Sequence, residues 1–120
     1  MTKKLEKDFL CNQAVEYILT QPVENLANLT VAEIARHLDV SHSYLARKFK
    51  AERDYPLREY LFREKMIRSV YLLQNEENMT IRDLARMMGF FDAEYFAYLF
   101  KQHFGVSPGR YRSSKKRNIL

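Results

Sequence analysis

Cysteine, glycine, proline and tryptophan are scarce in this chain of 120 residues. One cysteine excludes an internal disulfide, so a reducing cytoplasm is the simplest expected setting. Three glycines and three prolines leave little material for long loops or for a strand-rich architecture. No apolar run approaches the roughly 20 residues that span a bilayer, so we expect no membrane partner. The start, Met1-Thr-Lys-Lys, leads into charge rather than into the apolar core of a signal peptide.

Patterns typical of catalysis and metal binding are also lacking. His37, His42 and His103 are scattered without the spacing of metal ligands, and no second cysteine completes a zinc site. No glycine-rich loop is present to hold a phosphate. Ser41 has no positioned acid near it, and helix capping explains this serine better than nucleophilic attack does. We therefore predict no enzymatic activity, no metal and no cofactor.

An internal repeat is the most informative feature of the chain. The segment Leu29–Arg36 (LTVAEIAR) reappears as Met79–Arg86 (MTIRDLAR), and Tyr44–Lys50 (YLARKFK) reappears as Tyr95–Lys101 (YFAYLFK). The offset is 50 residues in the first pair and 51 in the second, so one residue is inserted in the turn between them. A repeat of this period indicates two copies of one supersecondary unit.

Capping signals divide each copy into two short helices joined by a turn. Thr30 and Thr80 are each followed three residues later by an acidic residue, which is the spacing of a capping box. Asp39 and Gly89 occupy the turns, where both residue types tolerate left-handed backbone angles. A serine or an aspartate then caps the second helix. Each copy is therefore predicted to be a helix-turn-helix.

Further helices are expected outside the two copies. One runs from Asp8 to about Thr20, and a long one begins at Leu57, with Ile67 in its apolar stripe. A short helix follows Ser107 and the proline after it. Nothing alternates with period two for long, so we predict an all-α fold of seven helices, with two helix-turn-helix units joined by a long linker helix. The predicted division is residues 1–56 for the N-terminal unit, 57–75 for the linker helix and 76–120 for the C-terminal unit with its basic tail.

The second helix of the first copy has an inward and an outward side. Leu45 and Phe49 lie one turn apart and are predicted to face the core, which places Arg47 on the opposite side. A net charge of +5 favours a polyanionic partner, and the arginine fork matches O6 and N7 of guanine in the DNA major groove. Inside a helix-turn-helix we favour this base contact over a merely solvated arginine. The predicted contacts of this copy are Ser43, Ala46 and Arg47 on bases and Lys50 on a phosphate.

The second copy differs on its outward side. Phe96 and Phe100 are predicted to face inward, and Tyr98 then stands where the first copy has its arginine. Glu94 beside it is repelled by phosphates unless it accepts from cytosine N4, while Tyr98 suits a thymine methyl group or a phosphate. An equally weighted alternative is that this helix contributes mostly shape and backbone contacts. The predicted contacts are Ala93, Glu94, Ala97 and Tyr98 on bases and Lys101, Arg110 and Arg112 on phosphates.

A set of paired residues in and after the second copy carries a family resemblance. The pairs are Gly89-Phe90, Tyr95-Phe96, Phe100-Lys101, Phe104-Gly105 and Ser107-Pro108, followed by Tyr111-Arg112. This pattern resembles the signature of the DNA-binding domain of the AraC/XylS family of bacterial transcription regulators, over roughly Ala14 to Arg112. The resemblance implies seven helices and two helix-turn-helix units, each inserting its second helix into the major groove. Departures from the family pattern include Asp54, where glycine is usual, and Tyr98, where arginine is frequent.

Together these observations predict a sequence-specific double-stranded DNA-binding transcription regulator. We expect an activator, one chain of which reads two adjacent major-groove segments as a monomer and contacts RNA polymerase. A helical interaction module that docks on RNA polymerase or another regulator is the alternative. An RNA-binding protein is disfavoured because the deep, narrow groove of A-form RNA excludes such helices. Family members usually carry a separate effector-binding or dimerisation domain, and this sequence is compatible with a stand-alone member or with an excised C-terminal domain.

Overall fold

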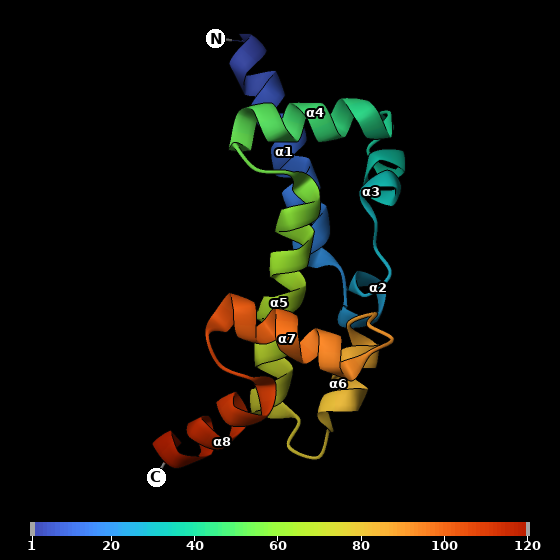
Figure 1. Cartoon of the computed structure of the whole chain (residues 1–120). Helices are drawn as coiled ribbons and strands as arrows, with labels where there is room; N and C mark the ends of the chain where they lie inside the picture. Colours follow the sequence, from blue (N-terminus) through green and yellow to red (C-terminus); the bar gives the residue numbers. More distant parts are fainter. Residues whose placement is uncertain (1, 120) are drawn as a thin grey trace. The chain divides into compact units, whose positions relative to one another are not determined.

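The computed structural model describes residues 2–119 of the chain, and it describes side-chain burial for residues 9–114. Over the described residues the chain forms eight helices and no strand, which confirms the all-α prediction (Figure 1). The helices are α1 (Thr2–Thr20), α2 (Val23–Leu26), α3 (Val31–His37), α4 (His42–Arg53), α5 (Leu57–Asn75), α6 (Ile81–Met87), α7 (Ala93–Phe104) and α8 (Pro108–Ile119).

The helix that the sequence did not predict is α2, which has four residues and follows Pro22. The predicted number of seven helices was therefore wrong by one. One turn is too short to show a periodic pattern, and the segment is held by the burial of Leu26. The last helix also differs from prediction, because α8 extends through the basic tail, whereas only a short helix after Ser107 was expected.

By packing, the chain divides into two compact units, residues 1–64 and residues 65–120. We call them the first and the second unit. The boundary falls inside α5, whereas the predicted division set this helix apart as a linker. The reason lies in its side chains, because Leu57 and Leu61 at the start of α5 belong to the core of the first unit. One continuous helix thus supplies an element to each unit.

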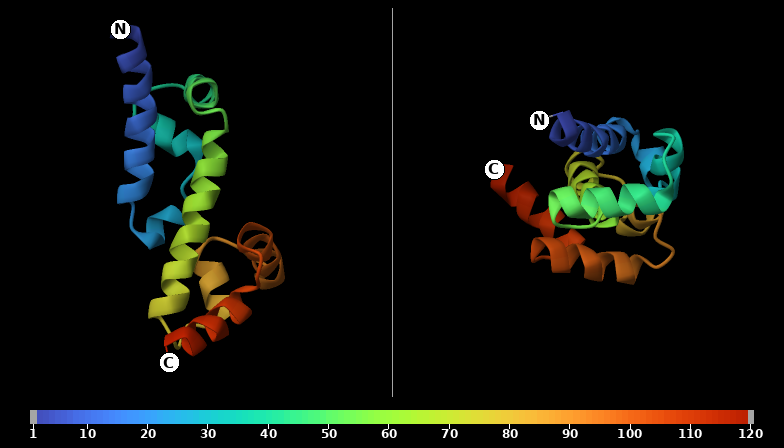
Figure 2. Two further views of the ribbon diagram at one scale, coloured as in Figure 1. Left: turned by 90° about the vertical axis from the view of Figure 1, so that its left-hand side faces the viewer. Right: turned by 90° about the horizontal axis from the view of Figure 1, so that it is seen from above.

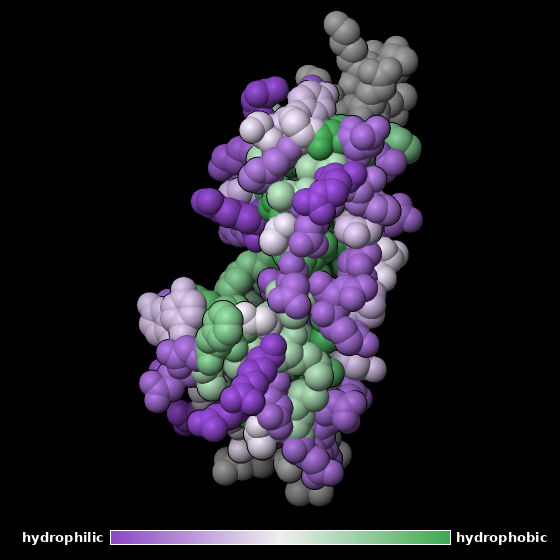
Figure 3. All heavy atoms as spheres, turned by 90° about the vertical axis from the view of Figure 1, so that its right-hand side faces the viewer, coloured by the Kyte–Doolittle hydropathy of each residue, from purple (hydrophilic) through white to green (hydrophobic). Residues whose placement is uncertain are grey.

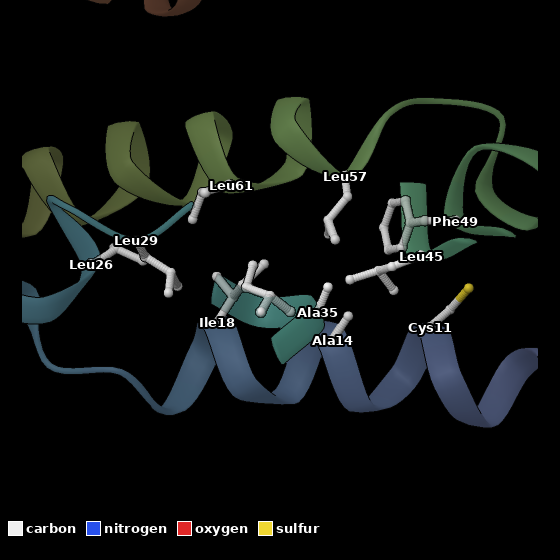
Figure 4. Close-up of a cluster of buried hydrophobic side chains, with 11 residues drawn as sticks. Cys11, Ala14, Ile18, Leu26, Leu29, Ala35, Leu45, Phe49, Leu57 and Leu61 are labelled. Carbon is white, nitrogen blue, oxygen red and sulfur yellow. The ribbon is translucent and has the colours of Figure 1, made fainter. Parts of the chain in front are cut away.

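Buried side chains from five helices, α1 to α5, form the core of the first unit (Figure 4). Cys11, Ala14 and Ile18 lie along one side of α1 and meet the buried residues of α3, α4 and α5. The cysteine is buried and serves as a small apolar side chain, as its position in the helical pattern predicts. Leu45 and Phe49 of α4 are both fully buried, which confirms the predicted inward side of this helix.

In the second unit, α7 contributes the corresponding aromatic pair. Phe96 and Phe100 are fully buried, with ring centroids 6.0 Å apart, and Phe100 meets the ring of Tyr111 of α8 edge-on at 6.1 Å. The inward side predicted for α7 is therefore confirmed. The apolar stripe predicted for α5 is wrong at Ile67, which is 54% exposed, because the helical face that packs instead carries Leu72 and other buried residues.

The turn of the first helix-turn-helix is a left-handed helix end. Asp39 has φ of 59° and donates its backbone N–H to the carbonyl of Arg36 at 3.1 Å. The N–H of Val40 reaches back to the carbonyl of Ala35 at 3.0 Å. These two bonds make a Schellman motif, which satisfies the last carbonyls of α3 and reverses the chain. Figure 2 shows that α3 and α4 then cross rather than run side by side.

The second turn repeats this motif and then departs from it. Gly89 has φ of 90° and donates to the carbonyl of Arg86 at 3.0 Å, and Phe90 donates to the carbonyl of Ala85 at 2.9 Å. One further residue, Phe91, then precedes the cap of α7, whereas Val40 is followed directly by the cap of α4. The residue inserted between the two copies is therefore located in the turn, as the offset of the repeat predicts.

Side-chain caps fix where the four helices of the two helix-turn-helix motifs begin, and each predicted cap is confirmed. An oxygen of the cap accepts a backbone N–H of the first turn, which would otherwise have no partner in the helix. Thr30 accepts from Glu33 at 3.2 Å, Ser41 from Tyr44 at 3.1 Å, Thr80 from Asp83 at 3.0 Å and Asp92 from Glu94 at 2.9 Å.

The structural repeat continues past the two helix-turn-helix motifs. Asp54 ends α4 with φ of 66°, and Gly105 ends α7 with φ of 84°. The aspartate thus takes the left-handed angle that glycine adopts without strain. In each unit a tyrosine of the next helix then packs on a buried phenylalanine. The ring centroids of Tyr60 and Phe49 lie 6.3 Å apart, and those of Tyr111 and Phe100 lie 6.1 Å apart.

Candidate nucleic-acid interface

The outward side of α4 is basic. Arg47 and Lys50 are exposed there together with Ser43, and Ala46 is half-buried on the flank. Because Leu45 and Phe49 hold the opposite side in the core, this face cannot turn inward without exposing both. The structure therefore brings together on one helix face the four DNA contacts predicted for the first copy.

Two cationic side chains of α4 make cation–π contacts with a tyrosine of the same helix. The guanidinium of Arg47 lies 5.9 Å from the ring centroid of Tyr44, and the ammonium of Lys48 lies 5.6 Å from the same ring. Such contacts are worth about 0.5–1 kcal/mol at exposed sites. Sequence reasoning did not assign Tyr44 to the interface, although its i, i+3 spacing to Arg47 is a signal that predicts the contact.

The outward side of α7 is aromatic and mixed in charge. Tyr98 stands at the position of Arg47 and is 57% exposed, with its ring stacked at 6.5 Å on that of Tyr95. Glu94 and Lys101 are exposed on the same side, and Ala97 is half-buried on its flank. Ala93 is the first residue of α7. The predicted contacts of the second copy on α7 therefore lie together as well.

A hollow adjoins the start of α7, and sequence reasoning missed it. Phe91 lines it together with Glu94 and with Arg82 and Arg86 of α6, and its volume is about 470 Å³. Phe91 itself is fully exposed, and Figure 3 shows apolar, green atoms at the surface among purple, polar ones on this side of the molecule. The change of offset from 50 to 51 was the signal that an extra residue stands here, but not that it is exposed.

Arg112 was predicted to contact a phosphate, and the structure argues against that. Its Nε donates to the carbonyl of Leu73, and its two terminal nitrogens donate to Met79 at 2.7 Å and to Glu76 at 3.2 Å. These carbonyls belong to the end of α5 and to the loop after it, where helical partners run out. The guanidinium therefore ties α8 to α5 within the second unit. Arg110, on the same helix, is exposed and stays a predicted phosphate contact.

Two residues of α5, Tyr60 and Lys65, have shifted pKa values. Burial raises the pKa of Tyr60, and the neighbouring carboxylate of Glu64 acts in the same direction. Burial lowers the pKa of Lys65. In both residues desolvation disfavours the charged form, so the shifts report how α5 packs and not chemistry at the interface.

The geometry defines a class of protein: a pair of helix-turn-helix units whose second helices each present an exposed face. A family model described as a helix-turn-helix domain matches residues 34–114. The chain belongs to this family, the AraC-type helix-turn-helix domains. The resemblance to the AraC/XylS family seen in the sequence is thereby confirmed.

Named relatives agree with this assignment. The chain is 35% identical over 92 residues to the Msm operon regulatory protein of Streptococcus mutans, a match that covers 77% of this chain and 33% of that protein. It thus spans about a third of the length of this relative. Neither this relative nor the similar structures are described as enzymes, in agreement with the predicted absence of an enzymatic step.

Two solved structures share the fold over most of the chain. The C-terminal domain of AraT, a response regulator from Geobacillus stearothermophilus, is 30% identical with a TM-score of 0.73, covering 88% of this chain and 84% of that one. A DNA-binding transcriptional dual regulator from Escherichia coli K-12 is 25% identical with a TM-score of 0.77, covering 90% of this chain and 93% of that one.

Among the helices of the described residues, none combines the length and the apolar character needed to cross a membrane.

Proposed function

We propose that this chain recognises a specific double-stranded DNA sequence and thereby regulates transcription as an activator. The observation that carries the proposal is the pair of exposed recognition faces with unlike residues, Arg47 at the centre of one and Tyr98 at the centre of the other. A recognition helix reads base edges in the major groove with the residues of its exposed side. Two unlike faces therefore favour a site with two different halves.

The number of chains on the DNA follows from the same observation. Proteins with one helix-turn-helix usually dimerise to reach two half-sites about one helical turn apart. Here both units belong to one chain, so a monomer suffices for two adjacent major-groove segments. The expected site is asymmetric rather than palindromic, because the residues at the two faces differ.

The role in transcription rests on the relatives. The Streptococcus mutans relative is named as an operon regulatory protein, and this chain matches a third of it. We propose the same general role for this chain in the cytoplasm, with RNA polymerase as the protein partner of the activator.

An interaction module is the second candidate, and the outward side of α7 favours it. Glu94 is repelled by DNA phosphates unless a base donor meets it, and Tyr98 is a frequent residue at protein interfaces. In this alternative α7 docks on RNA polymerase or on another regulator. DNA binding by α4 alone would then be weak and independent of any second half-site.

Selection from a pool of random duplexes tests the proposal. We expect enrichment of an asymmetric site with two halves about one turn of DNA apart. Inserting about five base pairs between the halves moves them to opposite faces of the duplex, and affinity should fall to that of one half-site. Sedimentation of the complex should show one chain for each duplex. No enrichment would contradict DNA recognition, and a two-chain complex on a palindrome would contradict the monomer.

A further inference from the structure

Two exposed aromatic rings of the second helix-turn-helix, those of Phe91 and Tyr98, have no aromatic counterpart in the first. Phe91 is fully exposed and has no counterpart in the turn between α3 and α4. Tyr98 and Tyr95 are stacked on the same helix and are both more than half exposed. At the position of Tyr98 the first unit carries Arg47, whose partner is again a tyrosine.

The exposure of Phe91 brings nothing to the stability of the fold. Burying a phenylalanine side chain stabilises a folded protein, and Phe91 in the turn does not contribute this stabilisation. Single exposed apolar residues are common and by themselves carry no meaning. Phe91, however, stands at the N-terminal end of a recognition helix, and this is the part of such a helix that contacts base edges.

The side chains around the aromatic residues include cations that can meet phosphates. Phe91 shares its hollow with Arg82 and Arg86 as well as with the acidic Asp92 and Glu94, and Lys101 is exposed one turn beyond Tyr98. Arginine and lysine side chains at the edge of a helix-turn-helix suit the phosphates on either side of the groove. The arrangement is an apolar centre with cations beside it, which matches the major groove.

In the major groove, one base offers an apolar group. Thymine carries a C5-methyl group beside its O4 acceptor, and apolar or aromatic side chains recognise thymine through that methyl. We propose that the second unit selects thymine in its half-site by contact of Phe91 and Tyr98 with C5-methyl groups. This inference rests on the proposed function, because it names what α7 reads once the duplex is bound.

The two halves of the site are then read by different chemistry. Arg47 recognises a base through directional hydrogen bonds, whereas Phe91 and Tyr98 recognise one through exclusion of water from a methyl group. We expect guanine in the half-site of the first unit and thymine in the half-site of the second. Glu94 tolerates this arrangement where adenine N6 or cytosine N4 donates to it.

Replacement of thymine by deoxyuridine tests the proposal directly, since it removes the methyl group and leaves the pairing intact. In the enriched duplex, each such change at a contacted thymine should weaken binding of the full chain about fourfold, as expected for one buried methyl-sized group. The same change in the half-site of the first unit should have no effect. Affinities are compared by fluorescence anisotropy on labelled duplexes at one salt concentration.

Phe91→Ala and Tyr98→Ala are the variants that connect the effect to the two rings. Each variant should show a smaller ratio of affinities between the thymine duplex and the deoxyuridine duplex. Base changes in the half-site of the first unit should weaken its binding as much as they weaken binding of the wild-type chain. Phe9→Ala is the matched control, because Phe9 is 63% exposed on α1, outside both helix-turn-helix motifs. This control should retain the full preference. Helix content by circular dichroism should be unchanged in all three variants.

The outcomes separate this proposal from the proposed function. If no duplex is enriched, DNA recognition itself is wrong, and the thymine proposal falls with it. If a site is enriched but deoxyuridine costs the wild-type chain nothing, DNA recognition stands and the methyl contact is overturned. If Phe91→Ala and Tyr98→Ala weaken binding equally with thymine and with deoxyuridine, the rings act on the backbone or on a protein partner, and the proposal is also overturned.

Discussion

The two helix-turn-helix motifs share their buried parts and differ in their exposed parts. Each is built on two buried side chains one turn apart, Leu45 and Phe49 in α4 and Phe96 and Phe100 in α7. At the centre of the outward side, by contrast, an arginine is replaced by a tyrosine. Packing constrains the buried positions to shapes that fill the same space. The outward positions face a ligand instead. Their divergence therefore favours the proposal that the two units contact different DNA bases.

A second contrast lies in the helix that follows each motif. Leu61 of α5 is buried in the first core, and Arg112 stands at the equivalent place in α8 with its guanidinium on three backbone carbonyls. The difference follows from the groups that face this position in each unit. In the second unit this position faces the end of α5, where carbonyls lack helical partners, and an arginine satisfies several of them at once.

The largest expected effect tests whether the two cores are equivalent. Phe49→Ala and Phe100→Ala should each lower the free energy of unfolding by about 3–5 kcal/mol, because each leaves a cavity in a packed core. Urea denaturation followed by circular dichroism measures the change. Phe91→Ala is the control and should stay within about 0.5 kcal/mol, as surface substitutions do. A much smaller loss for one core would show that it packs more loosely than the structure indicates.

The next effect concerns the position that differs most between the units. Arg112→Leu places the residue of the first unit into the second and should destabilise the protein by about 1.5–3 kcal/mol, since hydrogen bonds to a charged donor are lost. Denaturation curves measure this loss. Arg110→Leu on the exposed side of α8 is the control, with little expected change in stability. If Arg112→Leu instead leaves stability intact and flattens the salt dependence of DNA binding, the original phosphate assignment is correct.

The recognition faces are compared by binding. Arg47→Ala should weaken specific binding by about 1–3 kcal/mol and relax the preference at one or two base pairs, because a bidentate contact to guanine is lost. Competition with every single-base variant of the site measures the preference. An equal loss of affinity on specific and random duplexes would make Arg47 a phosphate ligand, and the contrast with Tyr98 would then vanish.

The smallest effect tests what the two units have in common. Lys50 and Lys101 occupy equivalent exposed positions, and each is predicted to contact a phosphate. Lys50→Ala and Lys101→Ala should each reduce the slope of log K against log salt by about 0.9 and weaken binding to all sequences alike. Titrations at several salt concentrations measure the slope. A slope near zero for the unchanged chain would count against DNA binding altogether.

Much of the fold was predictable because it depends on short windows of sequence. The caps at Thr30 and Thr80 and the left-handed turns at Asp39 and Gly89 each need only a few neighbouring residues, and the structure has all of them. The inward and outward sides of α4 followed from the helical period in the same way. Predictions failed where no local pattern exists, as at the single turn of α2.

By itself, the sequence determined two copies of a helix-turn-helix, their caps and turns, and the inward and outward sides of α4 and α7, since all of these are local or periodic. Only the tertiary structure decided what depends on partners far along the chain. Arg112 donates a hydrogen bond to the carbonyl of Leu73, which is 39 residues away, and no local pattern indicates this contact. The sharing of α5 between the two units and the exposure of Phe91 are decided in the same way. These features depend on which groups are buried and which need a hydrogen-bond partner after the helices have packed. The partners come from distant parts of the sequence, so a short segment cannot predict them.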